Sequence, residues 1–252
     1  MTTAPVPTRR ERARAATISE IQQTALQLMR QQSTTDIRFT DIARVMGMTA
    51  PGLYRYYADR DHLLTDLITD AYGQLGAAVA AAREQVPADD IGGRWLATAT
   101  AYREWARSEP QRFALILGMP VPGYTAPDEG PTTEAAKAAM GELAELFVRA
   151  STNGRLGKPL IRDVSPEMVA CARDKHPELD DVVPPESFQA MLQAWASLHG
   201  FTSLETYGHL DWICQEARDA LFRSHMEMAA KAAGIPAPVD QPWSWGPGGA
   251  SG

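Results

Sequence analysis

A tight turn between two short helical segments is the feature of this sequence that most constrains its fold. The stretch TDIARVMGMTAPGLYRYYADRDHLL, residues 40–64, places Gly47 between one apolar-sided segment and the next. Glycine readily takes the left-handed backbone conformation that such a turn needs. Thr49 follows as a helix N-cap, and Pro51 then falls in the first helical turn, where its missing N–H costs nothing. The segment therefore predicts a helix, a turn and a second helix.

Apolar residues at three- and four-residue spacing predict helices along most of the remaining chain. The first is expected from Thr17, and Thr40 is expected to cap the second. Asp59 is expected to cap the fourth, which begins near Asp61 and ends at about Gln85. Further helical patterns cover residues 94–108, 111–117, 132–150, 185–207 and 210–233. No segment shows clear strand alternation, so the sequence predicts an all-α fold with a small head and a larger helical body.

The charge of the chain is unevenly distributed between these two parts. Residues 1–60 contain nine arginines and five acidic residues, a net charge of +4. Because the whole chain carries −7, the remainder carries −11. A basic head on an acidic body indicates that the head meets a polyanion, although four net charges are also compatible with an ordinary solvated face.

The second helix of a helix-turn-helix enters the DNA major groove, with its N-terminal residues nearest the base edges. Here those residues are small, so the backbone can approach closely, and tyrosines and arginines that suit phosphates or bases follow them. Tyr57 is expected in the core. The same geometry also occurs in proteins that never touch DNA, and that alternative stays open at this point. The predicted DNA-contacting residues are Thr40, Thr49, Ala50, Pro51, Gly52, Tyr54, Arg55, Tyr56 and Arg60.

The stretch FTDIARVMGMTAPGLYRYYADRDHLL, residues 39–64, resembles the N-terminal domain of the TetR family of bacterial transcription regulators. It follows that family's pattern of DIA, a glycine in the turn, G-x-L-Y-x-Y-F and then K-x-x-L. Two positions depart from the pattern: Tyr57 stands for the usual Phe, and Arg60 for a Lys whose phosphate role it could keep. In the body, AWASLHGFTSLE, residues 194–205, is similar to the Trp-x-x-Leu-His-Gly element of the WHG subgroup of C-terminal domains.

The resemblance implies a homodimeric repressor that leaves a palindromic operator in double-stranded DNA when a small ligand binds. It also implies that the last two long helices pack against their copies, so that residues 185–233 form the dimer interface. The expected fold is an N-terminal three-helix helix-turn-helix domain plus a larger C-terminal helical ligand-binding and dimerisation domain. The expected parts are a flexible arm over 1–16, a DNA-binding domain over 17–72, a regulatory and dimerisation domain over 73–233 and a loose tail over 234–252.

Aromatic and other apolar residues of the body could line a pocket for a small apolar or aromatic ligand, or could simply form core and interface. Trp105 and Phe201 belong to the same apolar set, and Tyr124 lies on a Pro/Gly-rich loop that could act as a lid. The candidate pocket residues are Trp95, Tyr102, Phe113, Met119, Tyr124, Phe147, Trp195 and His199.

Other classes of function find little support in the sequence. Cys171 and Cys214 form no C-x-x-C pair and are expected as buried thiols in a bacterial cytoplasm. No metal, cofactor or membrane contact is expected, because no histidine has ligand-spaced partners and no apolar run is long enough to span a bilayer. Known catalytic motifs are absent, so an enzyme is the less favoured alternative. A ligand-independent or nucleoid-type DNA-binding protein is the other alternative.

Overall fold

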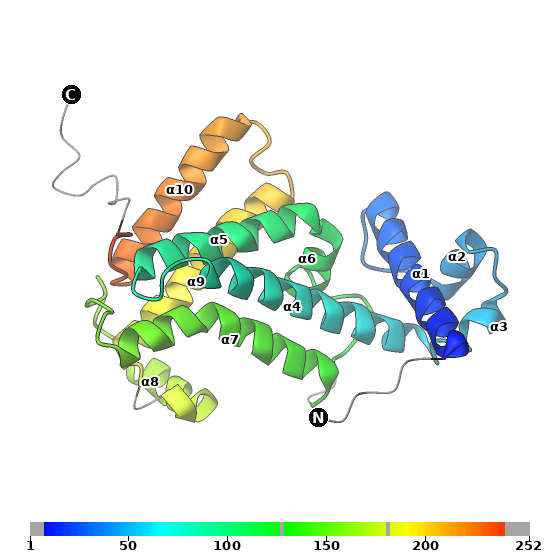
Figure 1. Cartoon of the computed structure of the whole chain (residues 1–252), viewed down its shortest axis with the longest axis horizontal. Coiled ribbons are helices and arrows are strands. Elements are labelled where there is room, and N and C mark those ends of the chain that lie inside the picture. Colours follow the sequence, from blue (N-terminus) through cyan, green and yellow to red (C-terminus); the bar gives the residue numbers. More distant parts are fainter. Residues whose placement is uncertain (1–7, 127–128, 180–181, 240–252) are drawn as a thin grey trace. The chain divides into compact units, whose positions relative to one another are not determined.

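The computed structural model describes residues 8–126, 129–179 and 182–239, and within those ranges all regular structure is helical (Figure 1). The observed helices confirm the predicted all-α fold class. Their bounds are α1 Arg9–Gln32, α2 Phe39–Val45, α3 Ala50–Leu53, α4 Arg60–Glu84, α5 Ile91–Ser108, α6 Pro110–Leu117, α7 Pro131–Thr152, α8 Pro166–Lys175, the short 3-10 helix η1 Pro177–Leu179, α9 Pro185–Thr206 and α10 Gln215–Ala232.

The chain divides into two compact units, each with its own packing. Unit 1 comprises residues 1–73 and 109–136, and unit 2 comprises residues 74–108 and 137–252. Helix α4 belongs to both units, because its first half lies in unit 1 and its second half in unit 2.

Helix α1 begins well before the predicted start at Thr17. Thr8 accepts a hydrogen bond from the backbone N–H of Glu11, and the Glu11 side chain accepts one from the backbone N–H of Thr8. This reciprocal capping box satisfies two N–H groups that would otherwise lack helical partners. Residues 9–16 are therefore helical, and the prediction of a flexible arm is wrong for them; residues 1–7 lie outside the described residues.

The helix-turn-helix forms where the sequence predicts it. Gly47 has a φ of +63°, in the left-handed region, and the Thr49 hydroxyl caps α3 by accepting from the backbone N–H of Gly52 at 3.2 Å. The prediction of Thr40 as the cap of α2 is wrong. The N-cap is Arg38, which makes no side-chain cap, because Phe39 is buried in the core and the helix begins two residues earlier than predicted.

The core of unit 1 joins α1, α3 and α4 to a later segment of the chain. Its buried residues include Ile21, Leu53 and Leu67, and it also takes in Leu115 and Val121 from the segment that follows α5. Residues 109–136 therefore pack with the N-terminal helices, and the single predicted domain over 73–233 does not match this division.

Unit 2 is built around α5, α9 and α10. Arg103 on α5 is buried and forms a two-pronged ion pair with Glu205 on α9, at 2.5 and 2.6 Å. Its guanidinium also lies 4.6 Å from the ring centroid of Phe222 on α10 and 2.8 Å from an Asp219 carboxylate oxygen. The buried Arg103 side chain therefore links α5 to both α9 and α10. Helix α8, which was not predicted, packs on α9.

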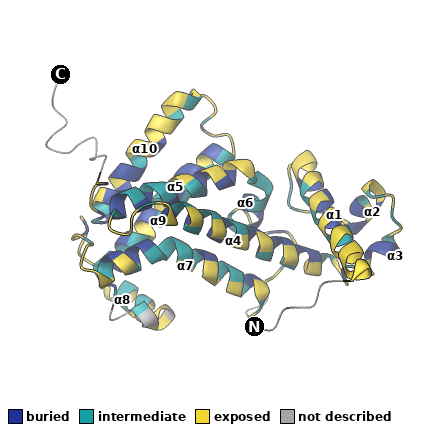
Figure 2. Cartoon of the chain, viewed as in Figure 1, coloured by how far each residue is buried: buried dark blue, intermediate teal, exposed yellow. Residues whose placement is uncertain are grey.

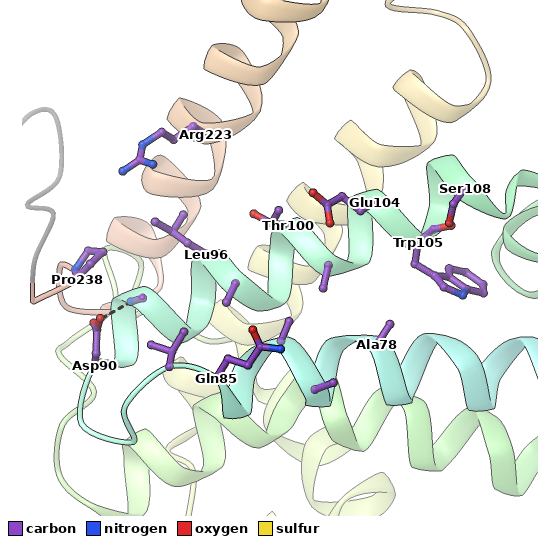
Figure 3. A pocket seen from close by; sticks show the side chains of 16 residues that line it. Ala78, Gln85, Asp90, Leu96, Thr100, Glu104, Trp105, Ser108, Arg223 and Pro238 are labelled. Carbon is purple, nitrogen blue, oxygen red and sulfur yellow. Dashed lines mark hydrogen bonds between the residues drawn. The ribbon is translucent and has the colours of Figure 1, made fainter.

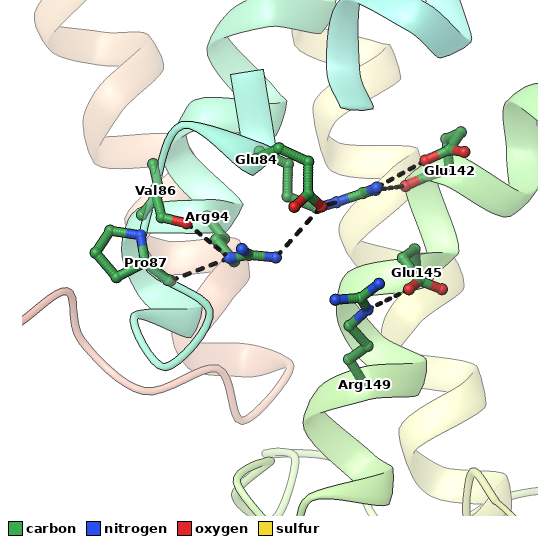
Figure 4. A network of polar contacts seen from close by, with 8 residues as sticks. Glu84, Val86, Pro87, Arg94, Glu142, Glu145 and Arg149 are labelled. Atoms are coloured by element: carbon green, nitrogen blue, oxygen red, sulfur yellow. Dashed lines mark hydrogen bonds and ion pairs between the residues drawn. The ribbon is translucent and has the colours of Figure 1, made fainter. Parts of the chain in front are cut away.

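A second arginine network holds α4, α5 and α7 within unit 2 (Figure 4). Arg83 donates to the carbonyl oxygen of Glu142 at 2.6 Å and to its carboxylate at 2.7 Å. Arg94 donates to the carbonyl oxygens of Val86 and Pro87, both at 3.0 Å. Both arginine side chains are buried, so their charges are stabilised by fixed partners and not by water.

The chain after α10 is packed as far as Val239. The backbone N–H of Gly157 donates to the carbonyl oxygen of Gly234 at 2.8 Å, and Ile235 is buried. The Val239 N–H donates to the Asp90 carboxylate at 3.2 Å. The predicted loose tail is therefore wrong for residues 234–239, and its remainder, 240–252, lies outside the described residues.

The Arg103–Glu205 pair yields a prediction for stability. Glu205→Gln should lower the free energy of unfolding by about 3 kcal/mol, because a buried guanidinium loses its main counter-charge. Glu145→Gln is the matched control, since Glu145 pairs with the exposed Arg149 and should contribute less than about 1 kcal/mol. Urea unfolding of both variants measures the difference, and equal losses would show that burial does not set the strength of the Arg103 pair.

Candidate nucleic-acid interface

The turn and the start of α3 present small side chains at the surface. Thr49 and Pro51 are exposed, and Ala50 is half-buried. Gly52 is buried, and its N–H is already donated to Thr49, so it is not itself placed to contact DNA. A side-chain carbon at Gly52 would lie 3.2 Å from the Thr49 hydroxyl, so glycine keeps the cap and the turn compact.

Tyr54 directs part of its ring outward. The ring packs against Phe39 at a centroid distance of 5.3 Å, yet the residue is 54% exposed. Packing on one side restricts the side chain, so its hydroxyl needs little further ordering to donate to a phosphate or a base. Thr40 on α2 is also exposed.

Arg55 and Tyr56 are linked to α1. The Arg14 side chain donates to the backbone carbonyl oxygen of Arg55 at 3.0 Å, and its guanidinium lies 5.2 Å from the ring centroid of Tyr56. Arg55 itself is exposed, whereas Tyr56 is half-buried against the core of unit 1. The sequence pattern did not indicate this contact, because the first two turns of α1 have no apolar face.

Arg60 is occupied by contacts within unit 1. Its guanidinium donates to the carbonyl oxygens of Ile37 and Pro122, at 2.9 and 3.1 Å, and to the Asp36 carboxylate at 2.9 Å. The predicted phosphate contact by Arg60 does not agree with this arrangement. Its role in the structure is to tie the segments around Asp36 and Pro122 to the start of α4.

Tyr57 lies in the core, as the sequence predicts. It is 5% exposed, and its hydroxyl accepts a hydrogen bond from Gln22 at 3.1 Å. Burial, with Asp66 nearby, raises the pKa of the Tyr57 hydroxyl well above its ordinary value, so the residue stays neutral. The hydroxyl that distinguishes it from the usual Phe is thus satisfied by a side chain of α1.

The eight predicted pocket residues are divided between the two units. Phe113, Met119 and Tyr124 belong to unit 1, and the other five to unit 2. Met119 is 83% exposed, and the Tyr124 hydroxyl is within 3.1 Å of the Thr65 hydroxyl. These residues were selected because they are apolar, a property that core, surface and pocket positions share.

In unit 2 the predicted residues form two packed groups. Trp95 donates from its indole nitrogen to the carbonyl oxygen of Met226 at 2.9 Å and meets Phe147 edge-on at 6.3 Å. His199 stacks on Trp195 at 5.5 Å, and its Nδ1 lies 3.0 Å from the Tyr102 hydroxyl. Trp95, Phe147 and Tyr102 are buried, whereas Trp195 and His199 are half-buried on α9.

An open hollow lies between α4 and α5, with α10 and Pro238 at its edge (Figure 3). This open groove has a volume of about 1050 Å³. Small side chains make most of its walls, among them Ala78, Ala97 and Ala101, and Trp105 is its aromatic residue. Figure 3 shows the Trp105 indole directed from α5 toward α4. Alanines give no sequence signal of a ligand site, which explains why this groove was not predicted.

The ends of α9 and α10 carry exposed apolar side chains. Trp212 in the connecting turn is 83% exposed, and Leu204 and Leu221 are each almost half exposed. Scattered single residues of this kind are normal on a surface, but a series on two consecutive helices indicates an interaction face. The large apolar residues exposed here are Leu192, Leu204, Tyr207, Trp212, Leu221 and Met228.

Several expectations concern other chemistry. Cys171 and Cys214 are exposed free thiols, so their predicted burial is wrong; Cys171 lies within α8, and Cys214 is the N-cap of α10. Among the described residues no group of three or more His, Cys, Asp or Glu side chains could hold a metal ion. No helix in the same part of the chain has the length and apolar character to cross a membrane.

Comparison with known proteins places this architecture among DNA-binding regulators. The sequence model of the tetracyclin repressor-like C-terminal domain matches residues 95–229. HTH-type transcriptional regulators Rv1816 of Mycobacterium tuberculosis and Mb1846 of Mycobacterium bovis are each 36% identical over 172 residues, covering 66% of this chain and 70% of theirs. The crystal structure of SCO4313 superposes with a TM-score of 0.68 at 32% identity, covering 88% of this chain and 98% of that one.

The pKa values of two histidines are shifted in opposite directions, so we expect opposite effects of pH on the free energy of unfolding. Burial lowers the pKa of the His199 imidazole in the folded protein below its ordinary value of about 6.5. As the pH falls below about 6.5, the unfolded chain therefore takes up a proton at His199 more readily than the folded chain does, and the folded state loses stability. The hydrogen bond that His62 makes to the Asp59 carboxylate raises the pKa of His62, so its contribution to stability is present at low pH and is lost as the pH rises through the folded value.

Urea unfolding near pH 5.5 and near pH 7.5 measures both effects. His199→Gln should reduce the loss of stability at the lower pH, and His62→Gln should increase it slightly. If His199→Gln left the difference between the two pH values unchanged, burial of His199 would not contribute to acid sensitivity.

Proposed function

Because the chain belongs to the TetR family of transcriptional regulators, we propose that it is a homodimeric repressor that a small ligand releases from a palindromic operator. The family makes it a DNA-binding regulator of transcription and not an enzyme. The assignment of its C-terminal domain to the WHG subgroup remains a prediction.

The exposed start of α3 is the observation that carries the proposal. Thr49, Pro51 and Tyr54 are accessible on a helix that is locked by its own cap and by Leu53, which is fully buried. A recognition helix needs this combination, because its position must be fixed while its tip stays free to enter the major groove. Thr49 and Ala50 offer a hydroxyl and methyl groups to base edges, and Arg55 and Tyr54 suit phosphates.

A palindromic operator requires two recognition helices related by a two-fold axis, about 34 Å apart. The apolar side chains exposed on α9 and α10 support a dimer formed through residues 185–233. In a two-fold interface the same patch meets its own copy, and Leu204 and Leu221 provide apolar area on both helices.

The groove between α4 and α5 supports control by a ligand. Its small side chains and single indole suit a flat apolar or aromatic molecule, and Glu104 and Arg223 add charged groups to its lining. The part of α4 that lies in unit 2 lines this groove with Ala78 and Ala82. A ligand that binds tighter when α4 is displaced would favour a dimer that no longer fits the operator. A ligand-independent DNA-binding protein would not require such a groove.

Selection of bound fragments from genomic DNA tests the DNA-binding part of the proposal. A recovered inverted repeat with half-sites about one helical turn apart is expected. Recovery of unrelated fragments with no shared sequence would instead support a nucleoid-type protein.

Two substitutions test the proposed face. Arg55→Ala should weaken operator binding by about tenfold or more, because an exposed cation beside α3 is removed, and Tyr54→Phe should weaken it less. Arg149→Ala, which removes an exposed arginine of unit 2, is the control and should leave binding unchanged. Fluorescence anisotropy with the selected duplex provides the measurement, and full affinity in both unit 1 variants would show that another face meets DNA.

The dimer face is tested by placing a charge in it. Leu221→Asp should convert the protein to a monomer and abolish high-affinity operator binding, since a buried unpaired carboxylate is strongly unfavourable in an interface. Leu160→Asp is the control, because Leu160 is 77% exposed and lies outside α9 and α10. Light scattering after size-exclusion chromatography gives the mass. A dimeric Leu221→Asp protein would place the interface elsewhere.

A further inference from the structure

The N-terminal two turns of α1 carry unbalanced positive charge. Arg9, Arg10, Arg12 and Arg14 stand there against Glu11, a net charge of +3, and Glu11 is held in the capping box. Arg9, Arg10 and Arg12 are exposed, and none has an ion-pair partner within the described residues (Figure 2). No side chain of these turns contributes to the core, so packing does not explain why the helix extends this far.

From these observations we propose that the first two turns of α1 form a second DNA-contacting surface, which binds the phosphate backbone beside the half-site read by α3. The proposal rests on the proposed binding of DNA by α3 and adds a separate set of contacts to it. Its occupant is a duplex, because the surface offers several arginines and no apolar area.

The contacts of Arg14 place this surface next to α3. Its hydrogen bond to the Arg55 carbonyl oxygen and its position over the Tyr56 ring join α1 to the end of the recognition helix. Arg10 lies one turn before Arg14 and so shares its side of α1. A duplex held by Arg55 would therefore have its backbone close to the arginines of α1.

The shape of the element selects phosphates over base edges. An α-helix with its side chains is about 10–12 Å across, whereas the minor groove of B-DNA is about 6 Å wide. The helix body cannot enter that groove, and the major groove is assigned to α3. Arginine side chains on the outside of α1 can still reach phosphate oxygens along the groove wall, where the guanidinium binds two oxygens at once. Such contacts add affinity without reading sequence.

The test is the salt dependence of binding by the full-length chain. Fluorescence anisotropy would follow two labelled duplexes, the selected operator and a mixed-sequence 30-bp duplex of about the same length. Arg9, Arg10 and Arg12 are replaced together by Ala, which has high helix propensity and leaves the Thr8 cap in place. The slope of log affinity against log salt should fall by up to about 2.7, or 0.9 for each lost phosphate contact, and by the same amount on both duplexes.

Two controls separate a local contact from general charge. Replacement of the same three arginines by Lys should keep most of the slope. The variant Lys137→Ala, Lys158→Ala, Arg162→Ala removes three exposed positive charges from unit 2 and should leave the slope unchanged. Circular dichroism verifies that each variant keeps its helix content.

Each outcome bears on the proposal. If the α1 variant keeps the wild-type slope while the wild-type chain binds the operator, this inference is overturned and the repressor proposal stands. An equal loss in the unit 2 variant would also overturn it, because the effect would then come from net charge. If the wild-type chain binds neither duplex, the proposed function itself fails.

Discussion

The left-handed backbone at Gly47 is the constraint on which the helix-turn-helix of this molecule depends. A Cβ added there would meet no atom within 4 Å, so the glycine is required by its φ of +63° and not by lack of space. A residue with a side chain would be strained by about 1–2 kcal/mol in that conformation. The turn sets where α3 begins, and the burial of Leu53 then determines which side of α3 faces outward. At Gly52 the requirement is instead one of space, because the neighbouring side chains leave little room for a Cβ atom.

Local signals explain which parts of the fold could be predicted from sequence. Thr49 caps α3 and Asp59 caps α4, and in each case the side chain accepts a hydrogen bond from the backbone N–H three residues later. Such short-range interactions can be read from the sequence. Thr40 has the same chemistry, but burial of Phe39 overrides it, and a single sequence does not reveal that competition. The placement of residues 109–136 in unit 1 depends on contacts such as Tyr72 with the Ile116 carbonyl oxygen, which join distant segments and leave no periodic trace.

The candidate ligand site shows a different limit. Large aromatic residues mark where a chain is buried, and both a core and a pocket bury them. Trp95, Tyr102 and Phe147 are buried against other side chains, whereas most residues that line the groove have small side chains, including five alanines on α4 and α5. A hollow forms where the side chains of two neighbouring helices are too short to contact each other. Its presence therefore depends on the distance between the helices and not on any one residue type. That information requires the helices to be placed first.

Arginine serves two purposes in this chain, and its neighbours decide which. Arg83, Arg94 and Arg103 of unit 2 are buried and satisfied by carbonyl oxygens and carboxylates, so they stabilise helix contacts and add nothing to the surface field. Arg9, Arg10 and Arg12 are exposed on α1 without such partners in the described structure. The net charge of −7 counts the buried and the exposed arginines alike. It would argue against a polyanionic partner only if every charged side chain were equally accessible to that partner. Once buried pairs are set aside, the positive charge that remains accessible near α3 is what a duplex would meet.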